Sequence, residues 1–393
     1  MIILFSVIFI DLIGLGIIFP LLPLLKIKFA ISDIEVSYLV SSFVVANVIG
    51  SIVLGIISDK IGRKLPLSIP MFLLGIAYYF MANAETFTFF LICRALAGFF
   101  SGNFAVAFAA TSDLSTPETR LKYMGIIGAA FGLGFILGPA LGGFLVTGDT
   151  AENIDVNLPF TVSSFASIIS GLIAIFFFKE TLSKEDINNK IHKNVWHQFT
   201  AVFHNKSVII FTALNIICTI IQSAAQVYLG LWLYQYFHFT AQYIGIFWSL
   251  YAIIFTVAQL KLTKLLSPKK ALMAGFLIYG LAVSALTVVN KLEYVIIISI
   301  ALAIAIGILT PNLNTRLSLE GEKNQQGLIF GVSQSISALG RMIGPVCMGY
   351  LYHINHSLSW ISLGLFCFLT CIFIFFAVKI PEPTNISTKQ SEI

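Results

Sequence analysis

The chain has 393 residues, of which 58% are hydrophobic and only 10% are charged, whereas soluble domains carry about 25% charged residues. This composition excludes a water-soluble globule, and long apolar runs between short polar segments favour a polytopic α-helical membrane protein. The net charge is +5, but Lys and Arg are spread over the loops and form no basic stripe, so no nucleic-acid partner is expected.

The apolar runs predict twelve membrane-spanning helices. Each run is long enough, or nearly so, to cross about 30 Å of hydrocarbon at about 1.5 Å per residue. Because the runs are continuous and do not alternate, helices are favoured over a β-barrel. The predicted spans are residues 2–25, 35–57, 65–83, 88–112, 121–146, 159–178, 207–232, 240–260, 270–290, 293–315, 325–352 and 357–378.

The first span carries a carboxylate in the run IFIDLIGLGIIFPLLP, where Asp11 is surrounded by apolar side chains. Asp11 is about ten residues from the inner end, so it lies about 15 Å deep, near the midplane. Gly14 lies on the same helix face and gives Asp11 room at a helix contact, and Pro20 and Pro23 are expected to break the outer end of the span. Asp11 is predicted to carry a coupling proton; the alternative is a static charge pair that fixes helix register.

The loop after the second span reads GIISDKIGRKLPL, residues 55–67. Asp59 can pair with a base or cap a helix, Gly62 allows a tight turn, and the basic pair can bridge to the other half of the protein. We therefore predict a conformational latch; the alternative is a simple turn that follows the positive-inside rule. The latch residues are Gly55, Asp59, Gly62, Arg63 and Lys64.

Two arginines also lie within spans. Arg94 is about 27 Å from the inner side of span 4, and the difference of about 12 Å in depth argues against a tight ion pair with Asp11. We expect Arg94 to share a cavity with Asp11 in proton coupling or, alternatively, to order span 4. Arg341 in span 11 is expected between the two in depth, where it could face Asp11 across the two halves. One acid and two bases favour an anionic or zwitterionic substrate.

The fifth span repeats as the eleventh. MGIIGAAFGLGFILGPALGGFL at 124–145 matches FGVSQSISALGRMIGPVCMGYL at 330–351 at a constant offset of 206 residues. Small residues let helices approach closely and proline bends a helix, so the repeated pattern is either a hinge or ordinary helix packing. The residues of this hinge pattern are Gly134, Gly138, Pro139, Gly142 and Gly143.

The repeat predicts two parallel six-helix halves related by pseudo-twofold symmetry, residues 1–180 and 207–393, joined by a cytoplasmic linker at 181–206. This is a transporter architecture with its site near the midplane. Of the 23 Lys and Arg, eighteen fall in inner loops and the tail, three in outer loops and two within spans, if the N-terminus is inside. The positive-inside rule therefore places both termini in the cytoplasm.

The loop signature resembles G-x-x-x-D-x-x-G-R-[RK] of the major facilitator superfamily. FIDLIGLGIIFPLLP, LICRALAGFFSG and GLGFILGPALGG resemble spans 1, 4 and 5 of its drug:proton antiporters, especially the tetracycline efflux proteins. The resemblance implies the twelve-helix fold, proton coupling and an association of the span-5 glycine-proline pattern with export. The tetracycline exporters carry further acids in spans 3 and 9 and a histidine in span 8, and this chain has none of them. Asp11 is therefore the one predicted mid-membrane carboxylate that could carry a proton.

Other polar residues within spans are candidates for substrate contacts, although each could instead make an interhelical hydrogen bond. They are Arg341, Asn103, Gln222, Gln226, Tyr251, Asn312 and Gln334. The sequence contains no phosphate-binding loop, no nucleophile–base constellation and no cluster with metal-ligand spacing. We therefore expect no enzymatic activity, no cofactor and no metal.

These patterns predict a monomeric secondary transporter of a bacterial inner membrane. It exports a small organic compound or drug in exchange for protons, and the two halves alternate access to the site by rocking. One alternative is proton-linked import of a small organic anion or amino acid. The other is a membrane sensor that transports nothing.

Overall fold

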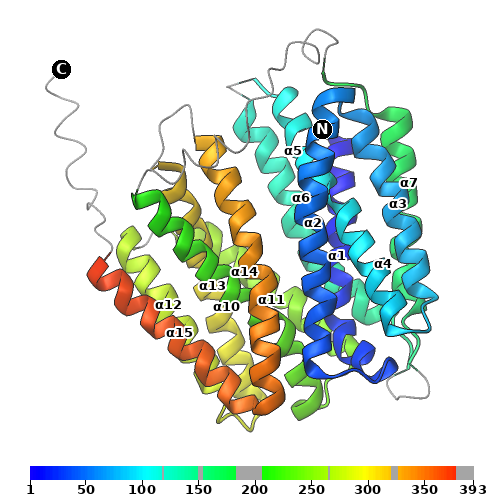
Figure 1. Ribbon diagram of the computed structural model, residues 1–393. Coiled ribbons are helices and arrows are strands. Elements are labelled where there is room, and N and C mark those ends of the chain that lie inside the picture. Colours follow the sequence, from blue (N-terminus) through cyan, green and yellow to red (C-terminus); the bar gives the residue numbers. More distant parts are fainter. Residues whose placement is uncertain (117–118, 149–153, 183–205, 264–265, 320–325, 378–393) are drawn as a thin grey trace, which may run out of the picture. The chain divides into compact units, whose positions relative to one another are not determined.

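The computed structural model (Figure 1) describes the whole chain except residues 117–118, 149–153, 183–205, 264–265, 320–325 and 378–393. The described residues form helices, with one isolated β-bridge between Thr147 and Asp155. The predicted all-α class is therefore confirmed. The predicted linker at 181–206 lies almost entirely outside the described residues.

Each of the twelve predicted spans is largely helical, although the ninth, predicted to reach residue 290, ends at Ala285. Among the described residues, ten helical spans are long and apolar enough to cross a membrane, so this is an integral, multi-pass membrane protein. The helices are α1 (Ile2–Lys28), α2 (Asp33–Ile61), α3 (Lys64–Ala82), α4 (Phe87–Phe100), α5 (Phe104–Asp113), α6 (Arg120–Leu145), α7 (Asn157–Phe177), α10 (Lys206–Phe237), α11 (Ala241–Lys261), α12 (Pro268–Ala285), α13 (Leu292–Leu319), α14 (Gln326–Ile354) and α15 (His356–Ala377).

The fourth span is interrupted near its middle. A short 3₁₀ segment, η1 (Ser101–Asn103), joins α4 to α5. The tighter 3₁₀ turn changes the direction of side chains relative to a continuous α-helix. This interruption places two polar residues, Ser101 and Asn103, in the buried interior of the first half.

Helix α1 does not end at its prolines. It continues through Pro20 and Pro23 to Lys28, so the predicted break at the outer end is wrong. Both prolines are buried, and α1 packs extensively along α6. Because surrounding helices stabilise a segment that has lost backbone hydrogen bonds, a membrane helix tolerates proline better than an isolated one. Helix α2 then begins with a capping box, in which Ser32 and Glu35 bond each other's backbone N–H groups.

The described chain divides into two compact units. The first contains residues 1–194, 223–252 and 341–353, and the second contains residues 195–222, 253–340 and 354–393. Within the first unit α1 packs against α6, α3 against α7 and α2 against α4; within the second, α12 packs against α13 and α15. The first unit thus includes the segments of α10, α11 and α14 nearest the α1–α2 turn. The division into halves at 181–206 stays a prediction.

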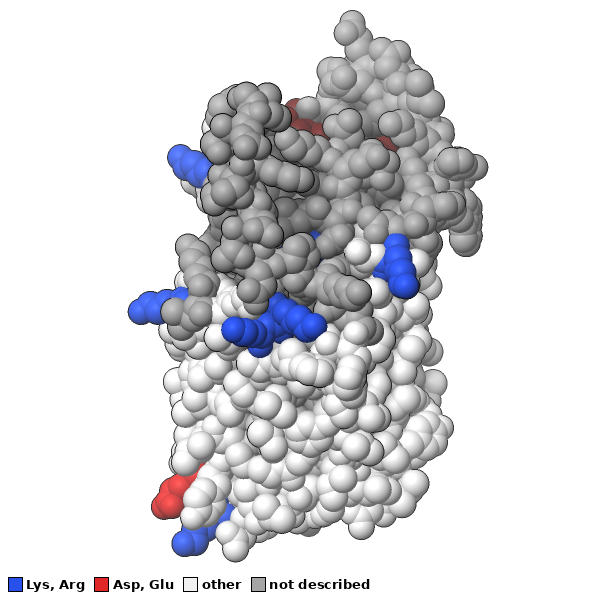
Figure 2. Space-filling view, turned by 90° about the vertical axis from the view of Figure 1, so that its left-hand side faces the viewer, with Lys and Arg blue, Asp and Glu red and all other residues white. Residues whose placement is uncertain are grey.

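The surface has the pattern expected of a protein surrounded by lipid. Large apolar side chains are exposed along α2, α7 and α15, including Ile52, Phe165 and Phe376. On the face shown in Figure 2, a broad band without Lys, Arg, Asp or Glu lies between the basic groups at and above mid-height and the charged pair near the lower edge. Hydrocarbon covers such a band without a solvation penalty.

Glycines allow α2 and α4 to approach closely. A Cβ on Gly98 would overlap the backbone carbonyl of Phe43, and a Cβ on Gly50 would overlap the carbonyl of Phe99. Both obstacles are backbone atoms, which cannot rotate away. The interface around Arg94 therefore depends on these two residues having no side chain.

We expect Gly98→Ala to destabilise the protein by about 1–3 kcal/mol, because the added methyl forces α2 and α4 apart. The matched control is Gly128→Ala on α6, where an added Cβ meets nothing within 4 Å. Thermal unfolding of the purified protein in detergent, followed by tryptophan fluorescence, measures both. Equal midpoints for the two variants would contradict the packing described here.

Candidate functional site

Asp11 is completely buried in the first unit and has one hydrogen-bond partner. The hydroxyl of Ser101 donates to its Oδ1 at 2.8 Å, and its Oδ2 has no partner. Ser101 reaches α1 because the 3₁₀ segment η1 positions it there. The sequence prediction missed Ser101, because it treated span 4 as one continuous helix. A carboxyl group with one donor and one unpaired oxygen is suited to binding a proton.

Arg94 is also buried, and α2 holds it in place. Its Nε donates to the carbonyl of Leu39 at 3.3 Å, and its guanidinium carbon lies 4.3 Å from the ring centroid of Phe43. A guanidinium over an aromatic face is attracted by the ring quadrupole. Its Nη1 is buried without a hydrogen-bond partner. The cation is therefore anchored on one side and unpaired on the other.

Neither arginine forms an ion pair with Asp11. Asp11, Arg94 and Arg341 all lie among the described residues, and no N–O distance of 4.0 Å or less joins the acid to either base. The absence of an Asp11–Arg94 pair agrees with their expected difference in depth. The sequence also suggests that Arg341 could face Asp11, but the two residues form no ion pair in this structure.

Tyr78 of α3 adds a polar group that the sequence prediction missed. Its hydroxyl is fully buried, has no hydrogen-bond partner and lies against Gly14, three residues after Asp11. The available signal was Gly14 itself, because a residue without a side chain beside a buried acid leaves room for a group from another helix. Asn103 of η1 is likewise buried, with both amide atoms unpaired. The interior of the first half thus holds several unsatisfied polar atoms around one acid.

The glycine-proline pattern on α6 serves two interfaces. Toward α1, an added Cβ on Gly138 would lie 2.9 Å from Cα of Gly16, and Gly134 and Gly142 also face α1. Toward α11, Gly143 faces the carbonyl of Ala241, and the carbonyl of Pro139 faces Gly245. The hydroxyl of Ser249 on α11 also donates to the carbonyl of Ile136 at 2.6 Å. Small residues thus let α6 lie close to both neighbours.

Arg63 connects three polar groups in the predicted latch. Its guanidinium bonds Asp59 at 2.9 Å, Asp113 at 3.0 Å and the hydroxyl of Ser58 at 2.6 Å. Ser58 in turn donates to the carbonyl of Gly55 at 2.8 Å. The side chain of Arg63 is almost entirely buried, so solvent screens these contacts little. The bridges predicted from Arg63 and Lys64 to the other half stay a prediction, because these contacts of Arg63 lie within the first half.

Gly62 and Glu180 fix the start of α3. Gly62 has a φ of +95°, which L side chains rarely adopt, and an added Cβ would overlap the Glu180 carboxylate. That carboxylate accepts the backbone N–H groups of Arg63 at 2.7 Å and Lys64 at 3.0 Å. A negative charge at a helix N-terminus is favourable. Burial raises the pKa of Glu180, but its backbone hydrogen bonds outweigh burial and hold the pKa below its ordinary value.

The remaining candidate residues are divided between the two units. Asn103, Gln226, Tyr251 and Arg341 belong to the first unit, and Gln222 and Asn312 belong to the second. Asn312 donates to the carbonyl of Ile308 at 2.8 Å, within its own helix. Gln334 lies on α14, but its side chain is outside the described residues. Among the described residues, no group of three His, Cys, Asp or Glu side chains is placed to hold a metal ion.

We expect Glu180→Gln to lower stability near pH 7 and to have a smaller effect as the pH falls. A carboxylate whose pKa is depressed by folding stabilises the protein above its unfolded pKa, about 4.3, and loses that contribution as the pH falls through the folded value. Thermal midpoints of wild type and variant from pH 7 down to about pH 3 measure the difference, because the contribution is lost only below the unfolded pKa of about 4.3. Glu85→Gln, which changes an exposed carboxylate, is the control; a constant difference for Glu180→Gln would contradict this role.

The comparison with known proteins agrees with this architecture. The sequence profile of the Major Facilitator Superfamily matches residues 4–270 and 261–392. The chain is 27% identical over 404 residues to the class E tetracycline resistance protein of Escherichia coli, covering 98% of each chain. It is 26% identical to multidrug resistance protein 2 of Bacillus subtilis, covering 90% of this chain and 89% of that one.

Solved structures share the fold at low sequence identity. A bacterial homologue of the human lysosomal transporter Spinster, in an inward-facing and occupied conformation, superposes with a TM-score of 0.83 at 15% identity, covering 96% of this chain and 95% of that one. The human organic anion transporter MFSD10 superposes with a TM-score of 0.69 at 19% identity, covering 95% and 98%. Since the family profile spans nearly the whole sequence, the chain belongs to the major facilitator superfamily.

Proposed function

We propose that the protein is a proton-coupled exporter of a small organic compound or drug. The observation that supports this most directly is the geometry of Asp11, a fully buried carboxyl in a membrane-spanning helix with one donor and one unpaired oxygen. A charge at the bilayer centre costs about 2.5–3.5 kcal/mol on an insertion scale. A carboxyl group avoids that cost by binding a proton. A buried Asp11 therefore favours the protonated form, and an Asp11 exposed to water favours the ionised form.

The direction and the substrate class rest on the relatives. Relatives named for tetracycline and multidrug resistance align with this chain over 98% and 89% of their own sequences. In a transporter family, such names favour export of a toxic compound over its import. Import of an organic anion or amino acid is the second candidate, but no observation on the described residues favours it over export. The excess of arginine over acid within the spans supports an anionic or zwitterionic compound.

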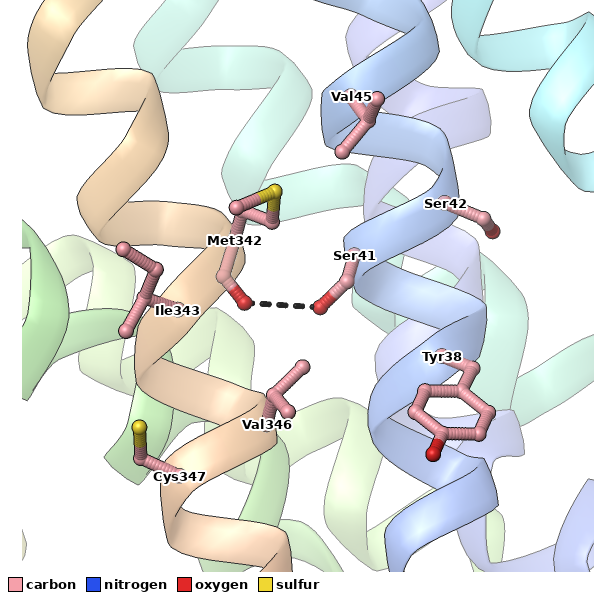
Figure 3. A pocket seen from close by; sticks show the side chains of 8 residues that line it. All are labelled: Tyr38, Ser41, Ser42, Val45, Met342, Ile343, Val346 and Cys347. Atoms are coloured by element: carbon pink, nitrogen blue, oxygen red, sulfur yellow. Dashed lines mark hydrogen bonds between the residues drawn. The ribbon is translucent and has the colours of Figure 1, made fainter.

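Contacts inside the first unit support alternating access. The hydroxyl of Ser41 on α2 donates to the carbonyl of Met342 on α14 at 2.9 Å (Figure 3). The hydroxyl of Tyr228 on α10 donates to the carbonyl of Asp33 at 2.7 Å. Both contacts join the two sequence halves on the side of the α1–α2 turn, which the sequence predicts to be the outer face. These contacts must separate for a midplane site to open outward.

The location of the chain belongs to the same proposal. The distribution of Lys and Arg supports two cytoplasmic termini, and the bacterial relatives support a cell membrane as the site of action. We propose that the transporter works as a monomer, with protons and a small molecule as its partners and without enzymatic chemistry of its own.

We expect substrates to release protons from vesicles only while Asp11 is intact. Inside-out vesicles holding the reconstituted protein are loaded with an acidic, pH-sensitive dye solution, and a panel of antibiotics and dyes is added outside. A substrate entering in exchange for protons raises the interior pH, and Asp11→Asn removes that rise because the site no longer binds a proton. Glu85→Gln should behave as wild type. Unchanged exchange in Asp11→Asn would overturn the assignment of Asp11.

Growth of an expressing strain on the same compounds gives the direction of transport. Export makes the strain resistant to a compound that exchanges in vesicles, whereas import makes it hypersensitive. A strain with normal growth and vesicles without exchange for any compound would favour the non-transporting alternative.

We expect a cross-link between α2 and α14 to stop transport. Ser41→Cys and Met342→Cys are introduced in a Cys347→Ser background, since Cys347 is exposed in the same groove (Figure 3). A short bifunctional thiol reagent should then block exchange, because α2 and α14 can no longer separate. Either single cysteine, treated in the same way, is the control. Full exchange by the cross-linked protein would show that this contact does not open during transport.

A further inference from the structure

We propose that Tyr78 is a positioning residue for the proton site: when Asp11 is ionised, the Tyr78 hydroxyl donates to its free oxygen and accepts from Arg94. This inference rests on the proposed function, since it assigns a second partner to the proposed proton carrier. It also supplies a connection between Asp11 and Arg94, which form no ion pair.

The position of the tyrosine is fixed from the side of α1. A Cβ built on Gly14 would lie 2.5 Å from the Tyr78 hydroxyl oxygen and 2.9 Å from the ring carbon that bears it. Residues three apart on a helix have Cβ positions about 5–6 Å apart, so the hydroxyl meets α1 within one helical turn of Asp11. Gly14 thus leaves the space in which the side chain of Tyr78 lies against α1, within one helical turn of the acid.

The unpaired atoms around this point are chemically complementary. Asp11 Oδ2, the Tyr78 hydroxyl and Arg94 Nη1 are all buried and all lack a hydrogen-bond partner. A carboxylate only accepts, a guanidinium only donates, and a phenol does both. A continuous hydrogen-bonded chain of the three groups is therefore possible in one order only, with Arg94 donating to Tyr78 and Tyr78 donating to Asp11.

The packing of the helices supports the same order. Helix α3, which carries Tyr78, packs against α4, which carries Arg94, whereas Asp11 and Arg94 form no ion pair. Among the described residues, the buried titratable or charged side chains of the helices in this part of the first half are Tyr78 of α3 and Arg94 of α4, besides Asp11 itself. Helix α6 faces α1 with glycines, including Gly134 and Gly138, and η1 contributes the neutral hydroxyl of Ser101.

The chain has a direct consequence for proton binding. Ionised Asp11 accepts hydrogen bonds from Ser101 and from Tyr78, and the cation behind Tyr78 strengthens the second bond. Protonated Asp11 needs one donor fewer and loses the attraction of Arg94. Tyr78 therefore favours release of the proton, and removing its hydroxyl should make Asp11 hold the proton to higher pH.

Infrared spectroscopy of the reconstituted full chain tests this without a substrate. The carbonyl stretch of a protonated carboxylic acid is followed while the pH is raised, and its loss in Asp11→Asn identifies the Asp11 band. We expect Tyr78→Phe to move the midpoint of that band upward by about one to two pH units, as for the loss of one hydrogen bond to a charged group. An unchanged or lowered midpoint would overturn the proposal.

Two further variants test the contact between Tyr78 and α1. One changes Gly14 on α1, and the other changes the neighbouring tyrosine as a control. Gly14→Ala keeps the phenol but displaces its hydroxyl, so its midpoint should also rise; this variant serves if Tyr78→Phe does not fold. Tyr79→Phe changes the adjacent tyrosine, which is 54% exposed at the surface, and should leave the midpoint unchanged. An equal rise in Tyr79→Phe would mean that the shift is not specific to Tyr78, which would also overturn the proposal.

The two proposals fail in distinguishable ways. If exchange requires Asp11 but the Tyr78→Phe midpoint equals that of wild type, the positioning role fails and the proton-coupled function stands. If the Asp11 band titrates and shifts in Tyr78→Phe but no compound exchanges for protons, the transport function fails and the hydrogen-bonded chain stands.

Discussion

The interior of the first half depends on one constraint: a carboxyl group in hydrocarbon must be either neutral or supplied with hydrogen-bond donors. Asp11 meets this constraint with a single donor, Ser101. That donor lies at the point where a 3₁₀ segment interrupts the fourth span. A continuous helix there would direct its side chains differently, so the irregular backbone and the buried acid depend on each other.

Close helix packing supports the same arrangement. Gly14 lets a tyrosine from α3 reach α1, Gly50 and Gly98 bring α2 against the helix that carries Arg94, and the glycines of α6 bring that helix against α1. In a bilayer, where apolar side chains gain little by leaving lipid, such contacts rely on small residues and on hydrogen bonds. The arrangement of the polar interior therefore depends on glycines at the helix contacts.

The latch region follows a different principle, because it lies at the end of the helices. Arg63 is bonded to two carboxylates and a hydroxyl, and Glu180 caps the helix that begins beside it. The geometry requires a turn with positive φ at Gly62, and a carboxylate lies directly against that turn. Charge compensation here joins the ends of α2, α3 and α5.

The sequence by itself determined the twelve spans, the buried acid, the two intramembrane arginines and the glycine-rich turn, because hydropathy, charge and spacing are local properties. Only the tertiary structure decided which groups meet. Ser101 is 90 residues from Asp11, and Glu180 is 117 residues from Arg63. The rotation of each helix about its axis, the 3₁₀ interruption and the tolerance of Pro20 and Pro23 all arise from packing between distant segments, which no local pattern specifies.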